Sequence, residues 1–319
     1  MPNILVSNIG FGLASPESLT KLQRVADVTL NEAAIRFTER DFIERIQSAD
    51  ILIAGTEKIT RLVVESATNL KLIARVGVGV DNVDLDCAQE NNISICYTPD
   101  APSEAVPEFT LSLMLNLIKG ISVSDRKMHK GIWHKPMGRM LSSMKIGIVG
   151  AGKIGSKVIN LIKSISPKTE ILFYDPYLES LEHAIKCDIE QLFRECDIVS
   201  LHIPLKDQTK GLVNDSLLNV MKKESYLINT SRGGVVDEIA LYHSLRNNHL
   251  AGAAMDVFEI EPYSGPLTEL DNCLTTSHMG SLTREVRALM EEQIVEDVMR
   301  FMSGQPFIRQ LHGFNFSGY

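Results

Sequence analysis

A glycine-rich run near the middle of the chain, KIGIVGAGKIG, has the residue types needed to hold a pyrophosphate. An apolar stretch leads into GxGxxG and then into helix-forming residues, the order expected where a strand turns into a helix. Gly150 would permit the tight turn, Gly152 the approach of the backbone to the phosphates, and Gly155 the packing of the helix on the sheet. Backbone N–H groups at the helix start favour an anion. The spacing predicts dinucleotide contacts at Gly150, Gly152, Lys153, Ile154 and Gly155.

An acidic residue, Asp175, follows the next apolar run, ILFY, at the distance of about 20 residues that is typical of a ribose-binding carboxylate. Such a carboxylate accepts the adenine-ribose hydroxyls and repels a 2′-phosphate. No arginine occupies 176–178, so the pattern favours NAD over NADP. A second interpretation stays open, because an aspartate before Pro176 also caps turns.

Three charged residues in the second half have side chains suited to proton transfer and to carbonyl recognition. His278 could give or take a proton near neutral pH. Glu261 could orient that ring, although the two residues lie so far apart in sequence that their contact must be tertiary. Arg232 could polarise a carbonyl oxygen and clamp a carboxylate. Taken alone, His278 and Arg232 also fit a surface histidine and a solvated loop arginine.

These residues sit in two series of alternating strand and helix patterns, which is typical of α/β domains with parallel sheets. Length favours two domains among the 319 residues. A long apolar helix is expected from residue 104 to a cap at Gly120, with Pro107 in its first turn and a less regular stretch over 121–144. The last helix, 283–302, has no strand after it and is expected to pack on the N-terminal domain. The expected strands are 3–7, 51–54, 72–76, 93–97, 145–150, 170–175, 197–204, 225–231 and 252–258.

Bulk composition narrows the class of protein. Hydrophobic residues make up 44% and charged residues 23%, as in globular proteins. The formal net charge of -8 argues against a nucleic-acid partner. No signal-peptide pattern and no long apolar run is visible, so we expect neither secretion nor a membrane span. The five cysteines match no zinc spacing and are expected to be buried thiols of a cytoplasmic protein, and no metal is expected.

Five motifs occur in one order: RVGVGVDN from Arg75, HIPL from His202, NTSRGG from Asn229, MDVFEIEP from Met255 and SHMGS from Ser277. Together they resemble the D-isomer-specific 2-hydroxyacid dehydrogenases, and the D-3-phosphoglycerate dehydrogenase branch most closely. The resemblance implies two Rossmann-like, doubly wound parallel-sheet domains with the active-site cleft between them. It assigns residues 1–99 and 283–319 to a substrate-binding domain and residues 100–282 to an NAD-binding domain.

The resemblance also implies roles for individual residues. NADH would supply a hydride to a small 2-keto acid, with catalysis by Arg232, Glu261 and His278. Further cofactor contacts are implied at His202, Pro204, Thr230 and Asp256, of which Asp256 would hold the nicotinamide carboxamide. The substrate carboxylate would rest on Val76, Gly77, Val78 and Gly79 through exposed backbone N–H groups.

Two regions of the sequence give information on whether the substrate carries a phosphate and on the oligomeric state. Phosphoglycerate dehydrogenases commonly carry a phosphate-gripping arginine in the loop that here reads IAGTEK, where Glu57 is an added acid and Lys58 the only base. Trp133 lies in a region that crosses to the partner subunit in this family, which implies a homodimer, although a buried structural tryptophan is the other interpretation. The leading hypothesis is an NAD-dependent 2-keto acid reductase. The alternatives are D-3-phosphoglycerate dehydrogenase and an NAD(H)-sensing, corepressor-like protein.

Overall fold

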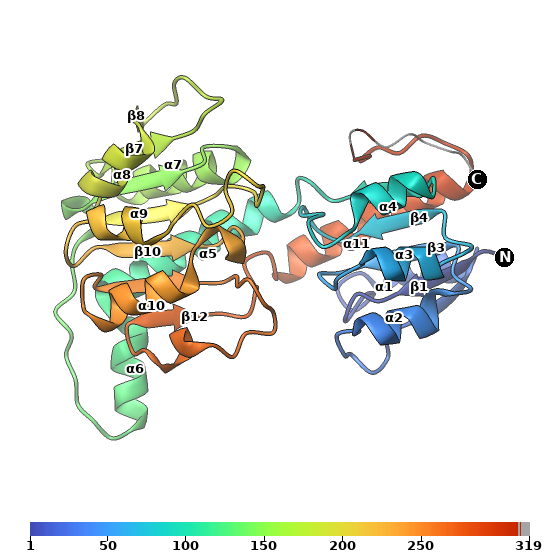
Figure 1. Ribbon diagram of the computed structural model, residues 1–319, viewed down its shortest axis with the longest axis horizontal. Coiled ribbons are helices and arrows are strands. Elements are labelled where there is room, and N and C mark those ends of the chain that lie inside the picture. Colours follow the sequence, from blue (N-terminus) through green and yellow to red (C-terminus); the bar gives the residue numbers. More distant parts are fainter. Residues whose placement is uncertain (312, 314–319) are drawn as a thin grey trace. The chain divides into compact units, whose positions relative to one another are not determined.

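A computed structural model describes residues 1–311 and 313 of the chain (Figure 1). The chain divides into two compact units. Unit 1 comprises Met1–Pro102 and Leu282–Tyr319, of which the structure describes 282–311 and 313, and unit 2 comprises Ser103–Ser281.

Unit 1 is built on a five-stranded sheet in the order β2-β1-β3-β4-β5, with every neighbouring pair parallel. Its strands are β1 (Asn3–Val6), β2 (Asp27–Leu30), β3 (Ile51–Ala54), β4 (Leu72–Arg75) and β5 (Ser94–Tyr97). Its helices are α1 (Pro16–Gln23), α2 (Glu39–Ile46), α3 (Arg61–Ser66), α4 (Leu85–Glu90) and α11 (Arg284–Met302).

Helices cover both faces of this sheet. Buried apolar residues of α2, α3 and α4 form one cluster with Leu52 and Ile73 of the central strands. On the other face α11 contacts α1, β4 and β5, so the last helix packs within unit 1. Parallel strands buried on both faces explain why these segments read as short, continuous apolar runs in the sequence.

Several helices of unit 1 begin at a side chain that accepts a hydrogen bond from an otherwise unpaired backbone N–H. Thr38 and Asp41 form a reciprocal capping box at α2. Thr60 caps α3 and Thr283 caps α11. Such caps are local in sequence, which is why the start of α11 is close to the predicted one.

Unit 2 contains a seven-stranded parallel sheet in the order β12-β11-β10-β9-β6-β7-β8. The first strand of the unit, β6, lies inside the sheet, with β7 and β8 on one side and β9 to β12 on the other. This is the doubly wound dinucleotide-binding order with one added strand, and its switch point lies between β6 and β9. The strands are β6 (Lys145–Val149), β7 (Glu170–Tyr174), β8 (Ile185–Lys186), β9 (Ile198–Leu201), β10 (Tyr226–Asn229), β11 (Gly252–Met255) and β12 (Cys273–Thr275).

Two apolar clusters fill the two faces of this sheet. On β10, for example, Leu227 belongs to one cluster and its neighbour Ile228 to the other. The first cluster takes in α8, α9 and α10, and the second takes in α5 and α7. The helices of the unit are α5 (Pro102–Lys119), α6 (Ile121–His129), α7 (Lys153–Ile165), α8 (Ile189–Glu195), α9 (Asp215–Val220) and α10 (Glu238–Arg246), with short 3-10 turns η1 (Leu141–Ser143), η2 (Gly233–Val235) and η3 (Pro266–Glu269).

The structure corrects the sequence-based description at the junction between α5 and α6. Helix α5 begins at Pro102, so Pro107 lies inside the helix rather than in its first turn. Gly120 ends α5 with a φ of 65°, as predicted. Of residues 121–144, which were predicted to be less regular, Ile121–His129 form α6, whereas residues 130–140 lie in no helix or strand. Short strands β2, β8 and β12 were also missed; β2 and β12 are edge strands of three or four residues and β8 has two.

Trp133 is not buried. Its side chain is 75% exposed, so the interpretation as a structural core tryptophan is wrong. Among the described residues, no single helix is long and apolar enough to cross a membrane, although α5 and α6, bent by 66° at their junction, pass that test as a pair. The described residues also contain no group of three or more His, Cys, Asp or Glu side chains placed to hold a metal ion.

Candidate active site

The structure of unit 2 brings His278 and Glu261 into contact. Nδ1 of His278 lies 3.0 and 3.1 Å from the two carboxylate oxygens of Glu261. Both side chains are partly buried, with 33% of the imidazole exposed. A carboxylate at Nδ1 fixes the orientation of the ring. Within the described part of the chain, Nε2 of His278 makes no hydrogen bond, so this nitrogen is available for proton transfer.

The turn that carries His278 is held by Asp256. His278 has a φ of 53°, an uncommon backbone conformation for a residue with a Cβ. Its N–H donates to the backbone carbonyl oxygen of Asp256 at 2.8 Å. The Asp256 carboxylate, only 1% exposed, accepts hydrogen bonds from the Met279 and Gly280 N–H groups and from the Thr276 hydroxyl. These contacts explain how the left-handed turn persists.

Arg232 lies in a turn that is organised by the side chain of Asn229 at the end of β10. The Asn229 amide donates to the Arg232 carbonyl oxygen at 2.8 Å, while its Oδ1 accepts from Ser231. Next to Arg232, Gly233 packs against the backbone of Phe258, whose N–H donates to Glu261. The Arg232 turn therefore packs on the segment that holds the histidine's partner. Asn229 was not predicted as a site residue, although its place at a strand end is a usable signal.

The glycine-rich loop has the geometry of an anion cradle. It joins the carboxyl end of β6 to α7, beside the switch point of the sheet. Gly150 has a φ of 90°, and a Cβ there would lie 2.6 Å from the His202 carbonyl oxygen. A Cβ on Gly155 would lie 2.0 Å from the Gly150 carbonyl oxygen, whereas one on Gly152 would meet nothing within 4 Å. Two glycines thus allow close packing and the third leaves open space for a ligand.

Asp175 contacts this loop. Its Oδ2 accepts a hydrogen bond from the Ala151 N–H at 2.9 Å, and its Oδ1 accepts one from the Tyr177 N–H at the same distance. The second bond is the turn cap that the Asp-Pro sequence suggested. The first places the carboxylate against the dinucleotide loop, so the capping and the cofactor interpretations are compatible.

Lys153 and Ile154 begin α7, and the predicted cofactor residues His202, Pro204 and Thr230 follow strands of the same sheet. His202 follows β9, and its Nε2 is 2.9 Å from the Ser200 hydroxyl. Burial lowers the pKa of His202 to about 3, so the ring is neutral at pH 7. Pro204 is exposed and Thr230 is buried, with its hydroxyl 2.9 Å from that of Thr110. Thr110 on α5 is a further contact that the sequence did not suggest.

The predicted substrate loop, which follows β4, belongs to unit 1. Val76 donates to Ala54, and the Gly77 N–H donates to the Thr98 hydroxyl at 2.8 Å, so the Gly77 amide already has an acceptor. The Val78 and Gly79 N–H groups find no acceptor among the residues that the structure describes. These two amides are the ones left to bind a substrate carboxylate.

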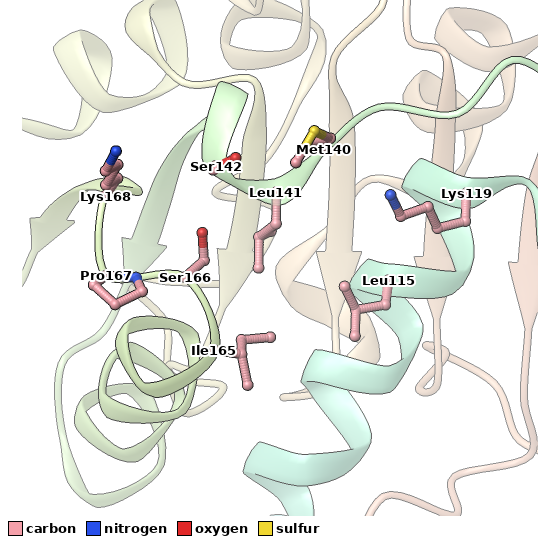
Figure 2. A pocket seen from close by; sticks show the side chains of 9 residues that line it. All are labelled: Leu115, Lys119, Met140, Leu141, Ser142, Ile165, Ser166, Pro167 and Lys168. Atoms are coloured by element: carbon pink, nitrogen blue, oxygen red, sulfur yellow. The ribbon is translucent and has the colours of Figure 1, made fainter.

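Unit 2 contains cavities that differ in how close their lining residues are to the predicted site residues. One of about 470 Å³ lies among α5, η1 and the end of α7, as Figure 2 shows with Leu115, Leu141 and Ile165. It contains none of the predicted site residues and lies near the start of β6, whereas the glycine-rich loop follows the end of that strand. Another, of about 530 Å³, is lined by Gly234, Glu259 and Pro262, which neighbour the site residues in sequence.

The cysteines carry none of this chemistry. All five are unpaired, and four are buried. Burial raises the pKa of Cys187 to about 11 and those of Cys196 and Cys273 to about 12, so these thiols stay protonated at neutral pH.

A family comparison agrees with this geometry. The family described as the D-isomer-specific 2-hydroxyacid dehydrogenase NAD-binding domain matches residues 111–280, more than half of the chain. The chain belongs to this family. The predicted family, the two Rossmann-like parallel sheets and NAD as the cofactor are confirmed. The family consists of NAD-dependent oxidoreductases that act on CH–OH groups.

Individual relatives carry different names. The chain is 35% identical over 299 residues to a D-3-phosphoglycerate dehydrogenase of Methanocaldococcus jannaschii, covering 91% of this chain but 56% of that protein. It is 35% identical over 305 residues to a glyoxylate reductase of Thermofilum pendens, covering 90% and 88%. A crystal structure of a Thermus thermophilus protein is 31% identical with a TM-score of 0.88, covering 97% of this chain and 99% of that one. The chain thus spans little more than half of the M. jannaschii relative's length.

Proposed function

We propose that this protein reduces small 2-keto acids to D-2-hydroxy acids, and that it catalyses the reverse reaction, with NAD(H) as the hydride carrier. The observation that carries the proposal is the His278–Glu261 pair, an imidazole oriented by a carboxylate with Nε2 left without a partner in the described chain. Such a pair is suited to general acid–base catalysis.

The cofactor site fits a dinucleotide. The open space at Gly152, the N-terminus of α7 and the carboxylate of Asp175 would hold the pyrophosphate and the adenine ribose. When bound, NADH supplies the hydride. Further contacts with the cofactor remain predictions, at Lys153, Ile154, His202, Pro204 and Thr230.

The chain's own residues supply the remaining functions. During reduction, Nε2 of His278 donates a proton to the carbonyl oxygen, and Glu261 at Nδ1 orients the ring for that transfer. Arg232 polarises the carbonyl through its guanidinium. The Val78 and Gly79 amides hold the carboxylate. In the reverse direction His278 takes the proton back.

We further propose that unit 1 binds the substrate and unit 2 binds NAD, with domain boundaries at 1–99 with 283–319 and at 100–282. The doubly wound strand order of unit 2 and its glycine-rich loop support its assignment. The Val76–Gly79 loop supports the assignment of unit 1.

A homodimer is also proposed. The segment after α6 exposes four large apolar side chains: Ile132 is 51%, Trp133 75%, Met137 98% and Met140 67% exposed. Exposed apolar residues gathered on one segment are typical of a contact surface, and a second copy of the chain is the proposed partner. Sedimentation of the wild type and of Trp133→Ser with Met137→Ser tests this, since the proposal expects a dimer and a monomer respectively.

Three further expectations, on nucleic acids, location and membranes, remain proposals. The net charge of -8 supports the absence of a nucleic-acid partner. Unpaired, mostly buried cysteines support a cytoplasmic location, and no membrane association is proposed.

The decisive experiment follows NADH oxidation with pyruvate, glyoxylate, hydroxypyruvate, branched 2-keto acids and phosphohydroxypyruvate. Turnover of one or more acids supports the proposed reaction. A marked preference for phosphohydroxypyruvate would instead favour D-3-phosphoglycerate dehydrogenase, the name of the M. jannaschii relative. NADH binding without turnover of any acid would contradict the proposal and favour NAD(H) sensing.

A further inference from the structure

Glu57 is a buried carboxylate with an unused oxygen. Its side chain lies in the loop after β3 and the residue is only 3% exposed. No donor within the described part of the chain reaches its Oε2, which is itself buried. A buried charged oxygen without a partner costs free energy, so an arrangement of this kind calls for a ligand that supplies the missing donor.

Three arginines lie near this loop. Arg36 donates to the Thr56 carbonyl oxygen within the loop itself, and the other two bond to neighbouring groups. Arg287 donates to Glu291, to the Asn8 side chain and to the Ile9 carbonyl oxygen. Arg75 donates to the Val76 carbonyl oxygen and to Asn82. Lys58, the residue next to Glu57, is exposed. The acid of the loop is therefore buried and its lysine faces solvent.

The Glu57 loop adjoins the proposed substrate loop. Both loops follow neighbouring parallel strands, β3 and β4, at the carboxyl edge where ligands of open α/β sheets bind. The Asn82 amide bridges them by donating to the backbone carbonyl oxygens of Gly55 and Glu57 at 3.2 and 2.7 Å. The Val76 N–H donates to the Ala54 carbonyl oxygen at 2.9 Å.

Gly55 brings the carboxylate close to its own backbone. A Cβ at Gly55 would lie 2.8 Å from Oε2 of Glu57 and 2.9 Å from the amide nitrogen of Asn8. A side chain at this position would have to displace these polar groups. The carboxylate thus occupies the space over Gly55 at the edge that carries the Val78 and Gly79 amides.

We propose that Glu57 is a specificity residue, which accepts a hydrogen bond from a hydroxyl group on the carbon chain of the 2-keto acid and disfavours a phosphate there. The inference rests on the proposed function and narrows its substrate class. A hydroxyl supplies the donor that Oε2 lacks. A phosphate would instead bring a like charge against a buried carboxylate, which is unfavourable in a low-dielectric site.

The test compares kcat/KM for hydroxypyruvate, pyruvate and phosphohydroxypyruvate with NADH. For the wild type we expect hydroxypyruvate to exceed pyruvate by about 100-fold, because a site built around a substrate hydroxyl strongly rejects the analogue that lacks it. We also expect kcat/KM for hydroxypyruvate to exceed that for phosphohydroxypyruvate by at least about 10-fold, because the buried carboxylate of Glu57 repels the phosphate.

In Glu57→Gln we expect the hydroxypyruvate-to-pyruvate ratio to fall by about 10-fold and phosphohydroxypyruvate to gain relative to hydroxypyruvate, because the amide is a weaker acceptor without charge. Both kcat/KM values of a ratio are measured on the same preparation, so a lower fraction of active protein does not change the ratio. The matched control is Glu44→Gln on α2, where the glutamate is 62% exposed and pairs with Arg40. Its ratios should equal those of the wild type.

Failure of this inference differs from failure of the proposed function. Turnover by the wild type with similar kcat/KM for hydroxypyruvate and pyruvate, or a preference for phosphohydroxypyruvate, overturns the role of Glu57 alone. Unchanged ratios in Glu57→Gln do the same. If that variant does not fold, the wild-type ratios still decide. Turnover of none of the three acids overturns both proposals.

Discussion

Gly233 and Phe258 lie so close that a Cβ on the glycine would be 1.9 Å from the Phe258 carbonyl carbon. Gly233 follows Arg232, and the Phe258 N–H donates to Glu261 at 3.2 Å. This single backbone approach therefore connects the turn of the proposed carbonyl-polarising arginine to the segment that holds the partner of His278.

Gly233→Ala is expected to separate these two segments. The added methyl group should cost about 1–3 kcal/mol of stability through overpacking. Because a displacement of about 1 Å at a catalytic group can cost about 100-fold in rate, we expect kcat to fall by about that factor. Gly234→Ala is the matched control, since its Cβ would meet only the flexible side chain of Leu205 at 3.3 Å. Equal kcat values for the two variants would contradict the argument.

Removing the proposed general acid should abolish most of the chemistry but not cofactor binding. We expect His278→Ala to lose at least about 100-fold in kcat. NADH affinity, measured by fluorescence titration, should be retained. His183→Ala removes a half-exposed imidazole from the same unit and should leave kcat unchanged. A near-normal kcat in His278→Ala would exclude this histidine from the mechanism.

Asp256→Asn distinguishes two roles for the same carboxylate. Its oxygens accept three hydrogen bonds from the His278 turn. In the asparagine variant, the side-chain NH2 group would replace one of these oxygens and would lie against a hydrogen-bond donor of the turn. We expect a loss of about 2 kcal/mol of stability and a reduced kcat, with a nearly unchanged Kd for NADH. A raised Kd with normal kcat at saturating NADH would show instead that Asp256 acts mainly on the nicotinamide carboxamide. Asp271→Asn, on an exposed aspartate, is the control.

Asp175→Ala should relax the preference for NAD. The variant removes a carboxylate that would repel a 2′-phosphate, and it also releases the Ala151 N–H in the glycine-rich loop. We therefore expect the ratio of kcat/KM for NADH to that for NADPH to fall by about 10-fold, mostly through weaker use of NADH. An unchanged ratio would limit Asp175 to capping its turn.

His202 should make the protein more sensitive to acid. Its folded-state pKa is lowered to about 3 by burial, while the unfolded imidazole takes up a proton near pH 6.5. The unfolded state thus binds more protons below pH 6.5, and stability falls by about 1.4 kcal/mol per pH unit from this group between about pH 6.5 and 3. In urea unfolding at pH 7, 6 and 5, His202→Gln should lack this part of the slope. Parallel stability curves for the two proteins would refute the assignment.

Local patterns determined much of the architecture. The run from β6 through the glycine-rich loop into α7 could be predicted because a strand, a turn and a helix that are consecutive in sequence are also neighbours in space. Likewise Thr283 marks the start of α11, because a cap bonds to an N–H three residues away. The limits of local reasoning appear at edge strand β12, whose three residues form a strand only by pairing with β11.

The chemistry depended on contacts between distant residues. The sequence alone named His278, Glu261, Arg232 and Asp175, because their residue types and motif positions were sufficient for that. Only the tertiary structure decided that Nδ1 of His278 meets Glu261, that Asp256 holds the histidine's turn, and that Glu57 is buried while Lys58 is exposed. The number of residues between two positions does not predict these side-chain distances. Which loops meet at the carboxyl edge depends on the order of the strands in the sheet, and that order belongs to the tertiary structure.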